Sequence, residues 1–274
     1  MTSKLYRLGS CSVFALVMVG SAPALAAGTA AGTSITNNAT VNYQVGGVAQ
    51  NSVTDGDTII VDRRIDVTVA EVGNVTTTVV PGQSAAVTTF TVLNSSNQTL
   101  DFLLTASQTA SGTASHGGTD NFDLTGLSLF RDTNANGTYD SGTDTAVTFL
   151  DELAADATVT IFAVGNVPLG RATNDVANVN LLATVREGGA SGSQGVAITA
   201  TVGANTAGVD TVFADAAGTA TGDIARDGQS SDNDDYTVQT ATITVDKRST
   251  VISDPVNNIT NPKLIPGAVV EYCI

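Results

Sequence analysis

A loop rich in aspartate and asparagine has the residue spacing of a calcium site. Residues 132–144 are Asp-Thr-Asn-Ala-Asn-Gly-Thr-Tyr-Asp-Ser-Gly-Thr-Asp. In a calcium loop, alternate side chains supply oxygen ligands, a glycine permits a sharp turn, and the residue after it offers its main-chain carbonyl. The pattern therefore predicts a structural Ca²⁺ site. Its first five ligands would be Asp132, Asn134, Asn136, Thr138 and Asp140.

The end of this loop departs from the EF-hand, in which two helices flank the calcium loop. Thr143 stands where a bidentate glutamate is expected, and Asp144 follows one place later. Asp144 completes the predicted ligand set if the loop relaxes around Gly142. The flanking residues are strand-like, so the loop resembles the calcium loops of dockerins and bacterial adhesin repeats, set here between strands. The alternative is an Asx-rich turn that closes a hairpin without metal.

Other groups of reactive side chains are sparse. His116 is the single histidine, and its Ser/Gly-rich surroundings predict an exposed loop residue. No Gly-x-Ser-x-Gly turn offers a nucleophile for a Ser–His–acid triad. One histidine and few cysteines also leave too few nitrogen and sulfur ligands for a zinc site. We therefore expect no enzymatic activity.

A second acidic cluster lies near the C-terminal side of the chain. Its spacing is irregular, which favours a solvated loop over a weak calcium site. The residues are Asp223, Asp227, Asp232, Asn233, Asp234 and Asp235.

The elements that would position these groups are β-strands. Apolar and polar residues alternate in residues 65–69, 158–164, 179–185, 196–202 and 241–245, which is typical of antiparallel strands with one buried face. No long window has a helical stripe, although residues 150–155 could form one helical turn. The polar stretches 107–121 and 204–235 predict long loops. The pattern favours an antiparallel Ig-like β-sandwich, with a closed barrel as the alternative.

The N-terminus predicts export from the cytoplasm. Residues 1–26 combine Lys4 and Arg7, an apolar stretch and the cleavage sequence Ala24-Leu25-Ala26 of a signal peptide. No other segment is apolar over the length of a membrane span, so no membrane insertion is expected. The formal net charge of −15 argues against nucleic acid as a partner.

An internal repeat suggests a modular protein. Val61-Asp62-Arg63-Arg64 recurs as Val245-Asp246-Lys247-Arg248, and each copy is followed by Pro-Gly and an alternating run. Residues 261–272, with Asn-Pro, Pro-Gly and Tyr272, resemble the opening of a bacterial Ig-like conserved repeat found in large envelope and S-layer-like proteins. The resemblance covers about 25 residues and implies a surface structural role.

These observations predict four parts: a signal peptide (1–26), an N-terminal strand segment (27–62), an Ig-like β-sandwich (63–250), and the first strands of an incomplete second module (251–274). The last part would be a fragment of a longer array, or would pair with another subunit.

The predicted function is that of a secreted structural or adhesive repeat protein of the cell envelope, stabilised by calcium. Its partners would be other envelope proteins, cell-surface polymers, or further modules joined by strand pairing. A carbohydrate-binding module is the alternative, although a chain with no Trp and five Tyr has few aromatic side chains on which sugar rings could stack.

Overall fold

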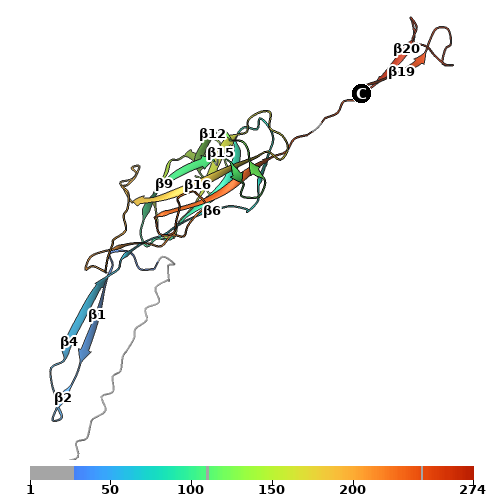
Figure 1. Ribbon diagram of the computed structural model, residues 1–274. Helices are drawn as coiled ribbons and strands as arrows, with labels where there is room; N and C mark the ends of the chain where they lie inside the picture. The colour runs from blue at the N-terminus through green and yellow to red at the C-terminus, as the bar shows by residue number, and fades with distance from the viewer. Residues whose placement is uncertain (1–27, 109–110, 242) are drawn as a thin grey trace, which may run out of the picture.

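The computed structural model describes residues 28–108, 111–241 and 243–274. The regular secondary structure of these residues consists of β-strands. No helix long and apolar enough to cross a membrane occurs among the described residues. The all-β prediction is confirmed. The predicted signal peptide lies outside the described residues. Figure 1 shows a body of packed sheets with a two-stranded hairpin leaving it at each end.

The first main sheet has five antiparallel strands in the order β13-β12-β15-β8-β6. Side chains in β8 alternate between buried and partly exposed along its whole length, as expected for a strand with one face against a core. The strand bounds are β6 (Val67–Glu71), β8 (Ala86–Asn94), β12 (Thr125–Arg131), β13 (Thr145–Ala146) and β15 (Thr158–Asn166).

The second main sheet is centred on β16. This strand pairs antiparallel with β18 on one side and with β9 on the other, and β14 extends the sheet beyond β9. At the opposite edge, β7 runs parallel to β18. On the β9 side of β16, the short β11 runs parallel to the start of β16. The strand bounds are β7 (Thr77–Val79), β9 (Leu100–Gln108), β10 (Gly112–Thr113), β11 (Thr119–Asp120), β14 (Phe149–Leu153), β16 (Val176–Glu187) and β18 (Gln229–Val238).

One hydrophobic core joins the two sheets. Phe90 and Ile161 from the first sheet and Phe102, Leu181 and Tyr236 from the second are fully buried in it. Burial of large apolar side chains is the main favourable term in folding, at roughly 25 cal/mol per Å². The inward alternation predicted for residues 158–164 and 179–185 is confirmed by this core.

The two sheets also meet along one edge, where β18 lies beside β6. Ser230 Oγ accepts a hydrogen bond from the N–H of Val69 at 3.0 Å, and Asp232 Oδ2 accepts one from the N–H of Glu71 at 2.8 Å. Polar side chains of β18 thus satisfy main-chain groups at the free edge of β6. An unsatisfied sheet edge invites pairing with other chains, so this contact also protects the edge.

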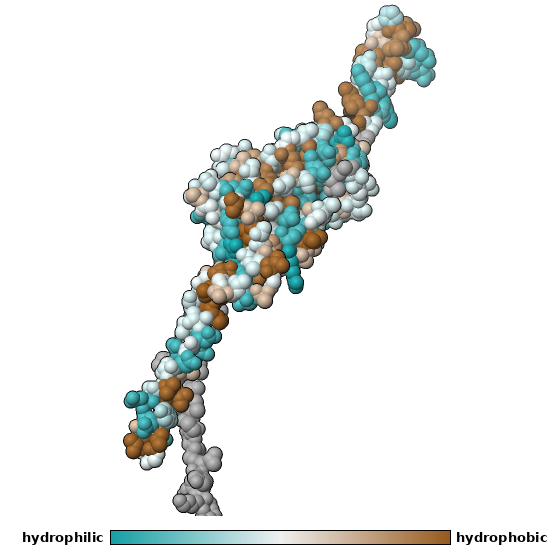
Figure 2. Space-filling view, turned by 60° about the vertical axis from the view of Figure 1, so that its left-hand side comes forward, coloured by the Kyte–Doolittle hydropathy of each residue, from teal (hydrophilic) through white to brown (hydrophobic). Residues whose placement is uncertain are grey.

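The terminal hairpins contribute little to the core. No side chain of β1 or β4 is buried, and Figure 2 shows apolar side chains, coloured brown, at the surface of both hairpins. The strands are β1 (Ser34–Val41) with β4 (Val53–Ile60), β2 (Gln44–Val45) with β3 (Val48–Ala49), and β19 (Arg248–Ser253) with β20 (Val269–Cys273). Residues 248–250 therefore lie in the C-terminal hairpin and not in the body.

Some predicted strands and loops are wrong. Residues 196–202 form only an isolated bridge and the described residues of 241–245 form no strand, with Val202 94 % and Ile243 85 % exposed. Conversely, the predicted loop 204–235 contains β17 (Thr211–Phe213), which pairs with β5 (Arg63–Ile65), and most of β18. Alternation alone does not supply the neighbouring strand that a sheet requires.

Candidate functional sites

The loop predicted to bind calcium connects β12 and β13. Tyr139, near its middle, packs against Phe130 and Phe162, with ring centroids 5.0 and 6.0 Å apart. Leu129 and Ile161, the neighbours of these two phenylalanines, face the core, so the phenylalanines lie on the outer face of the first sheet. The aromatic cluster fixes the loop to that face.

Two aspartates tie the ends of the loop together. Asp132 accepts hydrogen bonds from the N–H groups of Asn136 (3.3 Å) and Gly137 (2.8 Å). Asp144 accepts hydrogen bonds from the N–H groups of Thr133 (3.0 Å) and Asp140 (2.7 Å). Both carboxylates are more than 90 % buried. The turn through Gly142, whose φ is 92°, brings Asp144 back to the other predicted ligands.

Asp140 gathers the two asparagines. Its Oδ2 accepts hydrogen bonds from the side-chain amides of Asn134 (3.0 Å) and Asn136 (2.6 Å), and these bonds lower the pKa of Asp140. Thr138 donates its N–H to Asn136 Oδ1 at 2.8 Å. Rotation of each amide by 180° would present an oxygen in place of the nitrogen. The six residues therefore share one loop, and their oxygen-rich donor set fits Ca²⁺.

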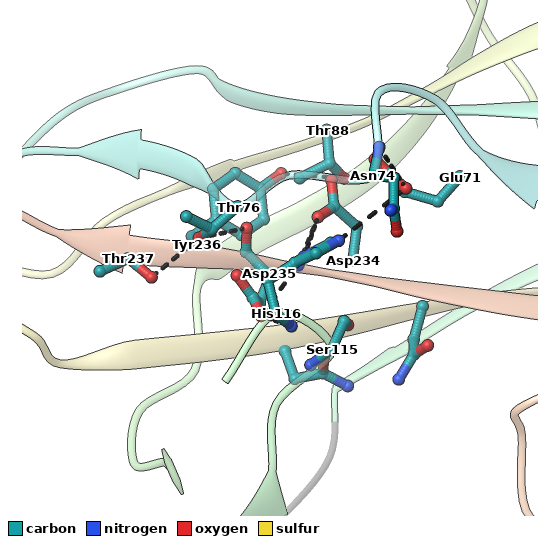
Figure 3. A network of polar contacts seen from close by, with 12 residues as sticks. Glu71, Asn74, Thr76, Thr88, Ser115, His116, Asp234, Asp235, Tyr236 and Thr237 are labelled. Atoms are coloured by element: carbon teal, nitrogen blue, oxygen red, sulfur yellow. Dashed lines mark hydrogen bonds and ion pairs between the residues drawn. The ribbon is translucent and has the colours of Figure 1, made fainter. Parts of the chain in front are cut away.

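A second cluster joins residues that are far apart in the sequence. Glu71 ends β6, His116 lies in the turn between β10 and β11, and Asp234 and Asp235 lie within β18 (Figure 3). The side chain of His116 is only 15 % exposed, and those of Asp234 and Asp235 are 3 % and 0 % exposed. The predictions of an exposed His116 and of a solvated acidic loop at 234–235 are therefore wrong.

The imidazole of His116 lies between carboxylates. Its Nδ1 is 3.4 Å from Asp234 Oδ1 and 3.6 Å from Asp235 Oδ2, and its Nε2 is 4.0 Å from Glu71 Oε2. The main-chain N–H of His116 donates to Asp235 Oδ2 at 2.6 Å and so holds the turn on β18. Glu71 accepts two hydrogen bonds from the N–H of Asn74, which fix the orientation of its carboxylate.

Burial makes this cluster electrostatically unusual. It raises the pKa of Asp234 to about 7, and the N–H of Asp235 opposes the rise while the negative charges of Glu71 and Asp235 add to it. A raised carboxyl pKa means that the anionic form lacks sufficient compensation from water or positive charge. The cluster therefore favours either a bound cation or a proton.

A polar groove crosses the outer face of the second sheet, with a volume of about 520 Å³. Asn180 lines it and donates from Nδ2 to Thr219 Oγ1 at 2.8 Å, while its buried Oδ1 has no hydrogen-bond partner among the described residues. None of the described residues that line the groove is aromatic. The groove thus lacks the stacking platform that would favour the carbohydrate-binding alternative.

Comparisons with known proteins do not assign this chain to a family. No family model matches it, and no curated protein matches it. One solved structure that it matches is that of AvmM, which catalyses macrocyclization in alchivemycin A biosynthesis. The two are 11 % identical, the match covers 75 % of this chain and 98 % of AvmM, and the TM-score is 0.27. A score this low carries no conclusion about the fold or the activity of this chain.

Proposed function

We propose that this chain is a secreted, non-catalytic structural or adhesive module of the bacterial cell envelope, built on an Ig-like β-sandwich. The strand order supports the Ig-like assignment. In chain order, β6, β8, β9, β12, β15, β16 and β18 take the places of strands A to G. The first sheet then has the order A-B-E-D and the second contains C-F-G, as in immunoglobulin domains.

The observation that carries the structural role is the pair of exposed hairpins at the two ends of the body (Figure 1). A two-stranded hairpin is marginally stable alone in water, and its open edges accept further strands. Exposed Val41, Val53 and Ile59 on the first hairpin add apolar surface. These features support packing or strand pairing with neighbouring modules or envelope proteins.

Export is the first test of this proposal. The chain expressed with residues 1–26 in a bacterial host is expected to leave the cytoplasm and to begin at Ala27, because those residues have the parts of a signal peptide. Cell fractionation and N-terminal sequencing measure both outcomes. A variant without residues 1–26 is the control and is expected to stay in the cytoplasm. Recovery of the full-length chain in the cytoplasm with Met1 intact would contradict export.

Calcium binding at residues 132–144 is part of the proposed role. A ligand that binds only the native state stabilises it, by about 2.7 kcal/mol at 100 times its Kd. Millimolar Ca²⁺ is therefore expected to raise the Tm by about 5–10 °C over calcium-free buffer. Differential scanning calorimetry in both buffers measures this shift.

The variants Asp132→Ala and Asp55→Ala separate the loop from general charge effects. Asp132 lies in the predicted site, and Asp55 lies on the exposed N-terminal hairpin. The calcium-induced shift in Tm is expected to disappear in Asp132→Ala and to persist in Asp55→Ala. An unchanged Tm of the wild-type chain in calcium would remove the calcium proposal, as would an equal shift in both variants.

A further inference from the structure

The cluster of Glu71, His116, Asp234 and Asp235 has the composition of a metal site. It offers one imidazole nitrogen and three carboxylates from three separate segments of the chain. One ligand atom from each of Glu71, His116 and Asp234 lies within 4.8 Å of the others. Since the three residues come from β6, the β10–β11 turn and β18, a shared ion would bind both main sheets and the turn together.

Distances around His116 Nδ1 match those between neighbouring ligands of a small cation. Two ligands of a tetrahedral Zn²⁺ with bonds of about 2.0–2.1 Å are separated by roughly 3.3 Å. The observed separations from Nδ1 are 3.4 Å to Asp234 Oδ1 and 3.6 Å to Asp235 Oδ2. These separations are too long for ordinary hydrogen bonds and are close to the edge of such a tetrahedron.

Glu71 occupies the other side of the imidazole. Its Oε2 lies 4.0 Å from Nε2, and its carboxylate is held by Asn74. A metal-bound histidine commonly directs its second ring nitrogen toward a carboxylate, which fixes the ring orientation. Glu71 can therefore either complete the ligand set or orient His116, and both roles need the ring in its observed position.

Within the described parts of the chain, two buried atoms of the cluster have no hydrogen-bond partner. They are His116 Nδ1 and Asp235 Oδ1. Asp235 is fully buried, and a buried polar atom without a partner destabilises the folded state. Figure 3 shows the side chains of Asp234, Asp235 and Glu71 directed toward the imidazole. A cation among these atoms would offset both the missing hydrogen bonds and the excess negative charge.

We propose that Glu71, His116, Asp234 and Asp235 form a binding site for one divalent transition-metal cation, with Zn²⁺ as the fitting ion. The ligand chemistry sets this choice. Ca²⁺ and Mg²⁺ prefer all-oxygen sites, whereas imidazole suits Zn²⁺ and its neighbours in the first transition series. The site is separate from the loop 132–144 and adds to the proposed function by joining the two sheets through an ion.

The single histidine makes the site directly testable by NMR. The chain has one His, so its imidazole ¹H and ¹⁵N resonances report on His116 alone. Addition of Zn²⁺ to metal-stripped, full-length mature chain is expected to shift these resonances, with saturation at one equivalent. Isothermal titration calorimetry with Zn²⁺ supplies the affinity. Unchanged imidazole resonances at two equivalents of Zn²⁺ would overturn the proposal.

Variants locate the site. His116→Ala and Asp234→Asn are each expected to weaken Zn²⁺ binding by about 100-fold or more, since even orienting residues around a metal contribute 10- to 100-fold. Ser115→Ala is the matched control: it alters the same turn by removing a 2.7 Å hydrogen bond to Asn178 but removes no ligand. Asp132→Ala tests the calcium loop as the binding site.

Both controls are expected to keep the wild-type Zn²⁺ affinity within about 3-fold, and circular dichroism checks that every variant is folded. Equal affinity in wild type and His116→Ala would show that Zn²⁺ binds elsewhere. The cluster would then be a set of polar contacts around His116 that holds the β10–β11 turn on β18.

Discussion

Replacement of Tyr236 by alanine is expected to lower the free energy of unfolding by about 3–5 kcal/mol, the range found for large aromatic residues in protein cores. Tyr236 lies in β18, and its side chain is fully buried between the two sheets. Its hydroxyl donates a hydrogen bond to the carbonyl of Ala163 in β15, at 2.8 Å. The variant would therefore lose both core packing and a bond that crosses from one sheet to the other. Urea unfolding followed by circular dichroism measures the difference.

Two further variants divide this effect. Tyr236→Phe keeps the ring but removes the hydroxyl that donates to the carbonyl of Ala163, so a smaller loss of about 1–2 kcal/mol is expected. Tyr272→Ala removes the same side chain from β20, where it is 64 % exposed, and should change stability by less than about 0.5 kcal/mol. A loss below 1 kcal/mol in Tyr236→Ala would mean that the two sheets do not share one core.

The strands of the body could be predicted where residues with alternating apolar and polar side chains also pair with a neighbouring strand. Residues 158–164 and 179–185 became β15 and β16, which lie inside their sheets and pair on both sides. Residues 196–202 alternate equally well, yet they form only the bridge between Arg186 and Ala197. The local sequence shows which side chains of a strand would face the core. It does not show whether another strand is available for pairing, because that depends on the topology of the whole chain.

Two local sequence patterns predict the wrong element, each for a physical reason. Residues 150–155 are predicted to form one helical turn, but residues 149–153 form β14, and a register shift between Leu150 and Leu153 lets both side chains reach the core. In β18, Ser230 and Asp232 are polar, which suggested a loop. Their side chains accept hydrogen bonds from main-chain N–H groups of β6, so polar residues are needed there to satisfy the edge of that sheet.

The two candidate sites differ in how far sequence could reveal them. The six predicted ligands of the loop 132–144 lie within 13 consecutive residues, so their spacing can be read from the sequence alone. The cluster around His116 joins residues 71, 116 and 234, and only the pairing of distant strands brings them together. The low number of histidines and cysteines predicts no zinc site, whereas the proposed site also uses carboxylates, which bind zinc as well.

The second large effect is expected at Asn94, at the end of β8. Its side chain is fully buried. Its Nδ2 donates to the carbonyls of Leu153 (2.8 Å), Gln98 (3.0 Å) and Ala154 (3.2 Å), and its Oδ1 accepts from the N–H of Ser96 (3.0 Å). Asn94→Ala would remove the side-chain partner of two buried main-chain groups, the carbonyl of Leu153 and the N–H of Ser96, at roughly 1–3 kcal/mol each. A total loss of about 3–5 kcal/mol in the free energy of unfolding is therefore expected, measured by urea unfolding.

An isosteric change at Asn94 separates hydrogen bonding from packing. Asn94→Asp keeps the shape but puts a carboxylate oxygen against the carbonyl of Leu153, so at neutral pH it should destabilise at least as much as alanine. Asn205→Ala is the matched control, because Asn205 is exposed and its side chain bonds only to Thr206 among the described residues. Its effect should stay within about 0.5 kcal/mol. If Asn94→Asp were as stable as the wild type, the side-chain amide could not be what joins the end of β8 to the turn after β14, and packing alone would have to hold the two sheets in register there.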